Sequence, residues 1–162
     1  MAIRKIRVIG DPCLGKTCKP VVKMTDNLRI LIGDMFDTMY EAKGVGLAAP
    51  QVGILRRICI VDVGDGDPVV LINPEIEASS GEQTDDEGCL SVPGKVAQVT
   101  RPDYVLVKSL DMDMNPVTYE GQGLRARAIL HELDHLDGIL YGERASEPYR
   151  DLEEEPEDYE EE

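Results

Sequence analysis

The first half of the chain contains one segment whose apolar residues recur at helical spacing. These residues are Leu28, Leu31, Ile32, Met35 and Met39. Because residues three or four positions apart share one face of a helix, the pattern predicts an amphipathic helix. Thr25 or Asp26 is suited to cap its first turn, and Gly44 stands where such a helix would end.

Short runs of β-branched and other apolar residues predict four strands. They cover residues 56–63, 68–76, 104–111 and 116–121. Gly-Asp-Gly-Asp at 64–67 separates the first two runs, and a turn-like Asp-Met-Asp-Met-Asn-Pro segment separates the last two. We therefore expect two pairs of strands.

A second predicted helix runs from about Leu124 to Asp137, and Gly138 follows as a stop. Its apolar positions are Leu124, Ala128, Ile129, Leu133 and Leu136. That stripe is too wide for a surface helix, so we expect burial on more than one side. One helix, then strands, then a central helix predict an α+β domain, with antiparallel or mixed β-sheets packed around this second helix.

Composition adds a boundary near the C-terminus. The chain of 162 residues has a formal net charge of −15, but residues 151–162 hold nine acidic residues and no basic one. Without that segment, 23 acidic residues face 17 basic ones, which is an ordinary balance. We predict a single catalytic domain over residues 1–148 and an acidic, disordered tail over residues 149–162.

The same features exclude several classes of partner. No basic stripe could neutralise phosphates, which argues against direct nucleic-acid binding. No apolar run reaches the roughly 18 residues that span a bilayer, and the N-terminal residues lack the apolar core of a signal peptide. We expect no membrane association and a cytoplasmic location, where the four cysteines would be reduced.

Candidate chemistry lies in the second predicted helix. The chain has two histidines, His131 and His135, and Glu132 follows the first. Side chains four positions apart project from one helix face, so both imidazoles could bind one ion. In this HExxH pattern the glutamate is not a ligand but accepts a proton from the attacking water. A buried imidazole pair without a metal would need other hydrogen-bonding partners, which favours a metal site over a chance match.

A catalytic metal normally takes three protein ligands, so one more is required. An extended HExxHxxGxxH motif would have a histidine where this chain has Tyr141. A glutamate some twenty residues downstream, the other common extension, would fall in the acidic tail. Cys89, preceded by Gly88, is a reasonable third ligand, and a metal would hold its thiolate deprotonated. Taken alone, a Gly-Cys-Leu segment is more typical of an inert cysteine.

The segment of small residues at 44–51 has two interpretations. Structurally, it is a helix-to-strand connection in which glycines supply unusual dihedral angles and alanines pack closely. Functionally, its small residues would let a peptide backbone approach, and Gln51 could direct an amide N–H at a developing oxyanion. The segment by itself leaves both interpretations open.

These three segments together resemble the marker motifs of the peptide deformylase family, written GxGLAxxQ, EGCLS and HExDH. The chain has GVGLAAPQ at 44–51, EGCLS at 87–91 and HELDH at 131–135, in the family's order. The resemblance spans roughly residues 3 to 145. It implies a hydrolase that removes formate from the N-terminal formylmethionine of new bacterial proteins, so that N-formylmethionyl peptides and nascent chains would be its partners.

The resemblance also implies a metal centre. Cys89, His131 and His135 would hold one divalent metal ion. The family's preference implies Fe²⁺ in the cell, while Zn²⁺, Ni²⁺ or Co²⁺ could substitute in a purified sample. The donor set itself suits several of these ions.

Further roles follow from the same resemblance. Glu132 would be the general acid and base, and the Gln51 amide with the Leu90 backbone N–H would form an oxyanion hole. The substrate backbone would add as a strand beside the chain, and the methionine side chain would enter a pocket. The residues implied for substrate binding are Val45, Gly46, Gly88, Leu124 and Ala128.

Two positions depart from the family pattern. Leu130 stands where many members have glutamine, and Val96 where several have arginine. The first is expected to affect helix packing, and the second removes a possible contact with the substrate peptide. Arg101 remains, and we expect it to pair with Glu87 and hold the cysteine loop.

Two alternative functions stay open on the sequence. One is a relative that binds metal or peptide without catalysis, and the other is a small HExxH metalloprotease. Retention of Glu132 and Gln51 argues against the first, because neither is needed to hold a metal. Tyr141 argues against the second, because it occupies the place of the protease's third histidine.

Overall fold

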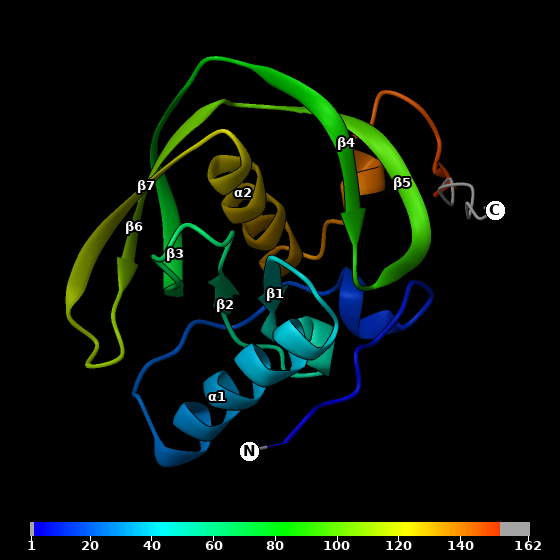
Figure 1. The fold of residues 1–162 in the computed structure, drawn as a ribbon. Helices are drawn as coiled ribbons and strands as arrows, with labels where there is room; N and C mark the ends of the chain where they lie inside the picture. Colours follow the sequence, from blue (N-terminus) through cyan, green and yellow to red (C-terminus); the bar gives the residue numbers. More distant parts are fainter. Residues whose placement is uncertain (1, 153–162) are drawn as a thin grey trace, which may run out of the picture.

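The structure is a computed structural model that describes residues 2–152. Figure 1 shows a helix enclosed by sheet, with a second helix on the outside. The α-helices are α1 (Asp26–Glu41) and α2 (Leu124–Leu136), and three short 3-10 helices are η1 (Pro12–Gly15), η2 (Ala49–Val52) and η3 (Tyr141–Glu143). The strands are β1 (Gly46–Ala48), β2 (Ile58–Val61), β3 (Val69–Ser80), β4 (Gln83–Cys89), β5 (Val92–Arg101), β6 (Tyr104–Leu110), β7 (Pro116–Gln122) and β8 (Arg150–Asp151).

The strands form two sheets on either side of α2. One has five strands in the order β1-β2-β3-β6-β7, and the other has three in the order β4-β5-β8. Neighbouring strands in both sheets are antiparallel. The predicted α+β class, with sheets packed around the helix that carries HExxH, is confirmed (Figure 1).

Helix α1 begins as the sequence predicts and ends earlier. The Thr25 hydroxyl accepts a hydrogen bond from the backbone N–H of Leu28 at 3.1 Å, so Thr25 is the N-cap. At the other end, Lys43 rather than Gly44 adopts the left-handed conformation, with φ of 59°. Gly44 has a different role: a Cβ there would lie 2.7 Å from the Leu90 Cδ1, so the Leu90 side chain would have to move. This glycine therefore serves the site rather than the helix end.

The α2 helix is the centre of the fold, as its wide apolar stripe predicts. Ten of its 13 residues are buried. Ile129 and Leu136 pack with residues of β1, β2, β3 and β6 in one apolar cluster. Leu130, the first departure from the family pattern, also belongs to this cluster, which agrees with the expected effect on packing. Burial on all sides gives the helix a fixed orientation, and hence fixes the directions of the side chains that it carries.

The four predicted strands are present, with β3 running to Ser80 instead of residue 76. The β4–β5 hairpin was missed. Its strand β4 has the sequence QTDDEGC, in which only Glu87 is buried. Aspartate and glycine are unfavourable in strands, and the segment has no alternation of apolar and polar residues. Neither signal from which a strand is predicted is therefore present.

The predicted boundary between domain and tail lies just before β8. Arg150 and Asp151 form β8 and pair with Val96 and Lys95 of β5, so the predicted disorder is wrong for the first residues of the tail. Residues 153–162, the larger part of the predicted acidic tail, lie outside the described residues. Within residues 2–152, no helix combines the length and the apolar character needed to cross a membrane.

Candidate metal centre and active site

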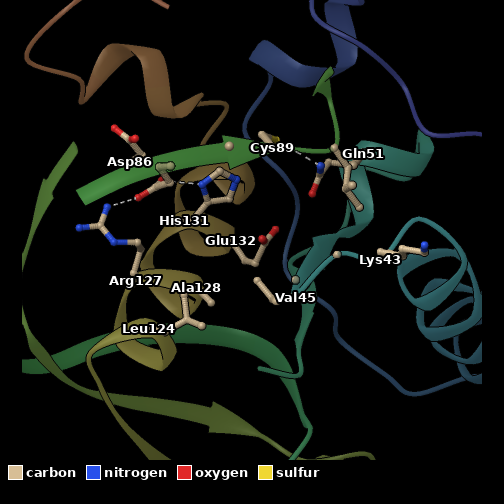
Figure 2. A pocket seen from close by; sticks show the side chains of 15 residues that line it. Lys43, Val45, Gln51, Asp86, Cys89, Leu124, Arg127, Ala128, His131 and Glu132 are labelled. Atoms are coloured by element: carbon tan, nitrogen blue, oxygen red, sulfur yellow. Dashed lines mark hydrogen bonds and ion pairs between the residues drawn. The ribbon is translucent and has the colours of Figure 1, made fainter. Parts of the chain in front are cut away.

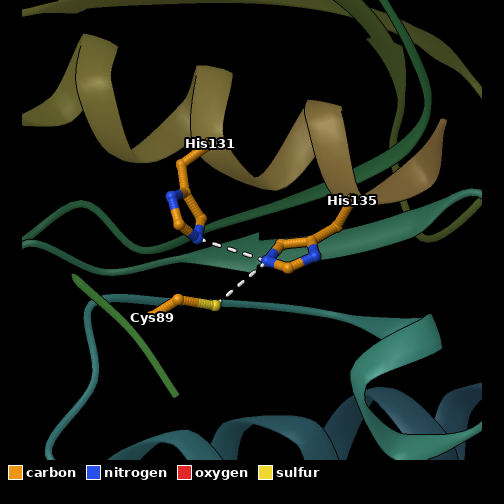
Figure 3. A group of neighbouring side chains, drawn as sticks. All are labelled: Cys89, His131 and His135. Carbon is orange, nitrogen blue, oxygen red and sulfur yellow. Dashed lines mark hydrogen bonds between the residues drawn. The ribbon is translucent and has the colours of Figure 1, made fainter. Parts of the chain in front are cut away.

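Three side chains from two distant segments of the chain converge on one point (Figure 3). The Nε2 atoms of His131 and His135 lie 3.2 Å apart, and the Sγ of Cys89 lies 3.3 Å from the Nε2 of His135. All three potential ligand atoms lie within 4.8 Å of one another. Metal–nitrogen bonds of about 2.0–2.1 Å place two ligands of a tetrahedral ion about 3.3 Å apart. The spacing therefore fits a single ion.

Two different elements supply these donors. The histidines lie one turn apart on α2, whereas Cys89 is the last residue of β4, where the chain reverses into β5. Cys89 pairs with Val92 across this hairpin, and a register irregularity falls between Glu87 and Cys89. The hairpin end directs the sulfur towards the imidazoles, although Cys89 and His135 are 46 residues apart in sequence.

Glu87 orients the first histidine. Its Oε1 lies 2.6 Å from the Nδ1 of His131, and its carboxylate also accepts hydrogen bonds from Arg101 and Arg127. Burial alone would raise the pKa of Glu87, but the hydrogen bonds from Arg101 and His131 hold it well below its usual range. An ionised Glu87 can only accept, so the His131 Nδ1–H donates, and the Nε2 atom of the ring faces the Cys89 sulfur and His135.

Burial leaves this donor set without enough protein partners. His135 is 1% exposed, its Nδ1 has no hydrogen-bond partner among the described residues, and burial lowers its pKa well below the ordinary value. A neutral imidazole is the form that binds a metal. The nitrogens of two buried histidines and the sulfur of the half-buried Cys89, all facing one another, are therefore suited to a divalent cation.

Glu132 lies beside the cluster on the same helix. The residue is 4% exposed, and its Oε1 has no hydrogen-bond partner in the described part of the chain. Burial raises the pKa of this carboxyl group to about 7, where a general base works well near neutral pH. Gly46 makes room for it, because a Cβ at this position would collide with the carboxylate.

Gln51 is held with its amide N–H groups towards the cysteine loop. Its Oε1 accepts a hydrogen bond from the Ala48 backbone N–H at 2.9 Å, which fixes the amide orientation. Its Nε2 lies 3.0 Å from the Ser91 Oγ and 3.6 Å from the Cys89 Sγ. Gln51 is 1% exposed, so a hydrogen-bond donor is positioned in advance at the edge of the cluster.

A pocket of about 290 Å³ opens beside these groups (Figure 2). The residues of the three motifs that line it include Gln51, Cys89, Leu90, His131 and Glu132. It is also lined by every residue that the resemblance implies for substrate binding: Val45, Gly46, Gly88, Leu124 and Ala128. His135 does not line the pocket but contacts Cys89 and His131, which do. The structure thus brings the predicted site residues together.

The pocket has further walls that sequence reasoning missed. Lys43, Asp86 and Arg127 line it, and Arg127 is 5% exposed with its Nη1 2.6 Å from Glu87. One signal was available: Arg127 lies four residues before His131, on a face of α2 that the apolar pattern buries. A buried arginine requires an acidic partner. The expected pair between Arg101 and Glu87 is present.

Comparisons with known proteins agree with this geometry. The family model for polypeptide deformylase matches residues 3–151. A peptide deformylase of Agathobacter rectalis is 60% identical over 94% of this chain and 96% of its own length, and one of Lachnoclostridium phytofermentans is 57% identical over 90% and 91%. The crystal structure of a Thermotoga maritima peptide deformylase has a TM-score of 0.87 at 44% identity and covers 91% of this chain and all of its own.

The α+β fold around an HExxH helix and the Cys/His/His cluster place this chain among metal-dependent hydrolases. The chain belongs to the peptide deformylase family. It is a hydrolase that removes the formyl group from N-formylmethionine peptides, with formylated nascent peptides as its substrates.

Proposed function

We propose that Cys89, His131 and His135 hold one divalent metal ion, which is Fe²⁺ in the cell and replaceable by Zn²⁺, Ni²⁺ or Co²⁺. The convergence of the Cys89 sulfur and the nitrogens of two buried histidines carries this proposal. The choice of iron follows the family's preference, since the donor set suits several ions. When bound, the ion supplies Lewis-acid activation of water and of the formyl oxygen.

Glu132 is the general base and acid in this proposal. It takes a proton from the attacking water and returns a proton to the leaving amine, so formate and a free N-terminus result. Support comes from its burial beside the cluster and from the raised pKa of about 7. A carboxyl group with this pKa can both accept and donate a proton near neutral pH.

Gln51 and Leu90 provide the donors for the oxyanion. The Gln51 amide and the Leu90 backbone N–H would hydrogen-bond to the formyl oxygen as it gains negative charge. The amide is already fixed by its contact with Ala48 and lies 3.6 Å from the Cys89 sulfur. Donors fixed before the reaction lose no free energy to reorganisation during it.

The substrate lies in the pocket as an extended strand. Its backbone runs beside Val45, Gly46 and Gly88, and its methionine side chain enters between Leu124 and Ala128. All five residues line the pocket, and glycines permit close approach of a second backbone. The substrates are nascent chains in the cytoplasm, reached without direct contact to nucleic acid or a membrane.

The proposal is tested by measuring formate release from formyl-Met-Ala-Ser alongside casein cleavage, with metal analysis of the same anaerobically prepared sample. We expect formate release, no casein cleavage and one metal ion per chain, mostly iron. Casein cleavage would favour the HExxH protease instead. Bound metal without formate release would favour a relative that binds metal or peptide without catalysis.

A further inference from the structure

The proposed metal site joins two parts of the molecule that pack separately. His131 and His135 belong to α2, which packs on the five-stranded sheet. Cys89 belongs to the β4–β5 hairpin of the three-stranded sheet. A metal that binds both requires the hairpin to stay in place against the helix. The segment after α2, residues 141–151, returns across the hairpin (Figure 1), and we name it the C-terminal clasp.

The first contact of the clasp is Tyr141, which is 1% exposed. Its ring centroid lies 5.8 Å from that of His131, and its hydroxyl donates a hydrogen bond to the Lys95 carbonyl of β5 at 3.1 Å. One side chain therefore touches both an imidazole of the cluster and a strand of the cysteine hairpin.

Tyr149 forms the second layer. Its ring centroid lies 4.9 Å from that of Tyr141, and its hydroxyl oxygen accepts a hydrogen bond from the Gly142 backbone N–H at 3.1 Å. Tyr149 also packs, with Cys89, on the small apolar cluster that contains Tyr141 and Val92. The two tyrosine rings thus contact the metal-ligand candidates His131 and Cys89, and neither ring lines the pocket.

The end of the clasp ties down both strands of the hairpin. Arg150 forms an ion pair with Asp86 of β4, and Asp151 forms one with Lys95 of β5. The β8 ladder adds backbone pairing to β5, and the Leu152 N–H donates to the Gly94 carbonyl at 2.9 Å. Exposed ion pairs contribute little individually, so the attachment depends on the aromatic layer together with the backbone pairing.

We propose that the C-terminal clasp positions the Cys89 sulfur against the two histidines, and that Tyr149 is its positioning residue. This inference rests on the proposed metal site. It assigns a role in the active site to a residue 14 positions beyond His135 that does not itself line the pocket. Without the Tyr149 ring, the hairpin end can move away from α2, and the thiolate is the ligand that is lost.

The test compares Tyr149→Ala and Tyr149→Phe in the full chain, with Tyr104→Ala as the matched control. Tyr104 is a tyrosine of β6 whose hydroxyl donates a hydrogen bond to Glu120; it neither lines the pocket nor belongs to the apolar cluster of Tyr141 and Tyr149. The Zn²⁺ affinity is measured by chelator competition, and the Co²⁺-loaded protein is examined for thiolate-to-metal absorption. We expect Tyr149→Ala to weaken Zn²⁺ binding by about 10-fold or more, the range seen when a residue that supports the metal ligands is removed. The thiolate-to-metal absorption of the Co²⁺-loaded variant should also weaken.

Tyr149→Phe keeps the ring and should bind Zn²⁺ within about threefold of the parent, while Tyr104→Ala should leave affinity and absorption unchanged. The melting temperature of the metal-free protein separates positioning from general stability. The proposal is wrong if Tyr149→Ala lowers that temperature without changing affinity or absorption. Tyr149→Leu provides the same comparison should the alanine variant not fold. Failure of the parent chain to bind Zn²⁺ would instead overturn the proposed metal site.

Discussion

The two regions that meet at the metal site are held in place by opposite means. Strand β2, beneath α2, consists of four buried residues, Ile58–Val61, and the helix packs on it through apolar side chains. In β4 the single buried residue is a carboxylate, Glu87, which is paired with Arg101 and Arg127. Apolar packing positions the histidines, whereas buried charge and the clasp position the cysteine.

The two regions therefore respond differently to substitution. An apolar core loses stability gradually as methyl groups are removed, and the helix direction is preserved. A buried carboxylate that loses a guanidinium partner retains its charge without compensation, which costs about 3–5 kcal/mol when the pair is broken completely. We therefore expect the hairpin side to control metal retention and the helix side to control global stability.

The largest expected effect is the loss of turnover in Glu132→Ala, which removes the proposed base without changing how the histidines or the cysteine are held. Glu132→Ala leaves the three candidate ligands and both regions intact but removes the proton acceptor. Turnover of formyl-Met-Ala-Ser should fall by up to about 10⁴-fold, while metal content is retained. The melting temperature should rise, because a buried carboxylate without a partner at Oε1 is removed. A variant that releases formate at near the parent rate would show that Glu132 is not the base.

Cys89→Ser tests the hairpin's own ligand. A serine hydroxyl is a poorer metal ligand than a thiolate, so affinity for Zn²⁺ should fall by more than the roughly 100-fold upper value seen for outer partners. Cys13→Ser is the control, since the Cys13 thiol contacts the Pro50 carbonyl outside the cluster. Metal content that survives dialysis in Cys89→Ser as in the parent would exclude Cys89 as a ligand.

Arg127→Met breaks one of the two guanidinium contacts to Glu87 and so loosens the charge-based side alone. Arg101 still pairs with Glu87, so we expect about a 10-fold loss of Zn²⁺ affinity rather than unfolding. Arg125→Met is the matched control on the same helix, because Arg125 pairs with Asp65 and Asp67 away from the cluster. Chelator competition gives both Zn²⁺ affinities. Equal affinities for the two variants would show that the Arg127–Glu87 pair does not control metal retention.

Ile129→Val removes one methylene-sized group from the apolar side and has the smallest expected effect. Ile129 is fully buried in the α2 cluster, so the free energy of unfolding should fall by about 1 kcal/mol. Metal affinity and turnover should match the parent. Urea unfolding of the metal-free protein measures the first quantity, and a loss of metal affinity larger than that of Arg127→Met would reverse the comparison.

The parts predictable from sequence are those with a strong local pattern. Apolar residues recur at helical spacing over Leu124–Leu136, and the interval from His131 to His135 places both imidazoles on one face. The helix and the pair of metal ligands could therefore be predicted from the same segment. The β4 strand could not, because its exposed aspartates and glycine show no apolar alternation. For the same reason nothing in the local sequence pattern marked Cys89; it became a candidate because the histidine pair needs a third ligand, and the motif resemblance then supported it.

The α+β class, the buried helix and the residue types that the site needs could all be predicted from the chain's local patterns. The contacts of Glu87 with Arg127 and His131, and of Tyr149 with Tyr141, depend instead on how the sheets and the helix pack. Glu87 and His131 are 44 residues apart, and no local periodicity encodes a contact over that distance. Such contacts arise when sheets and helix pack together, because side chains from separate elements then become neighbours in a site that excludes water.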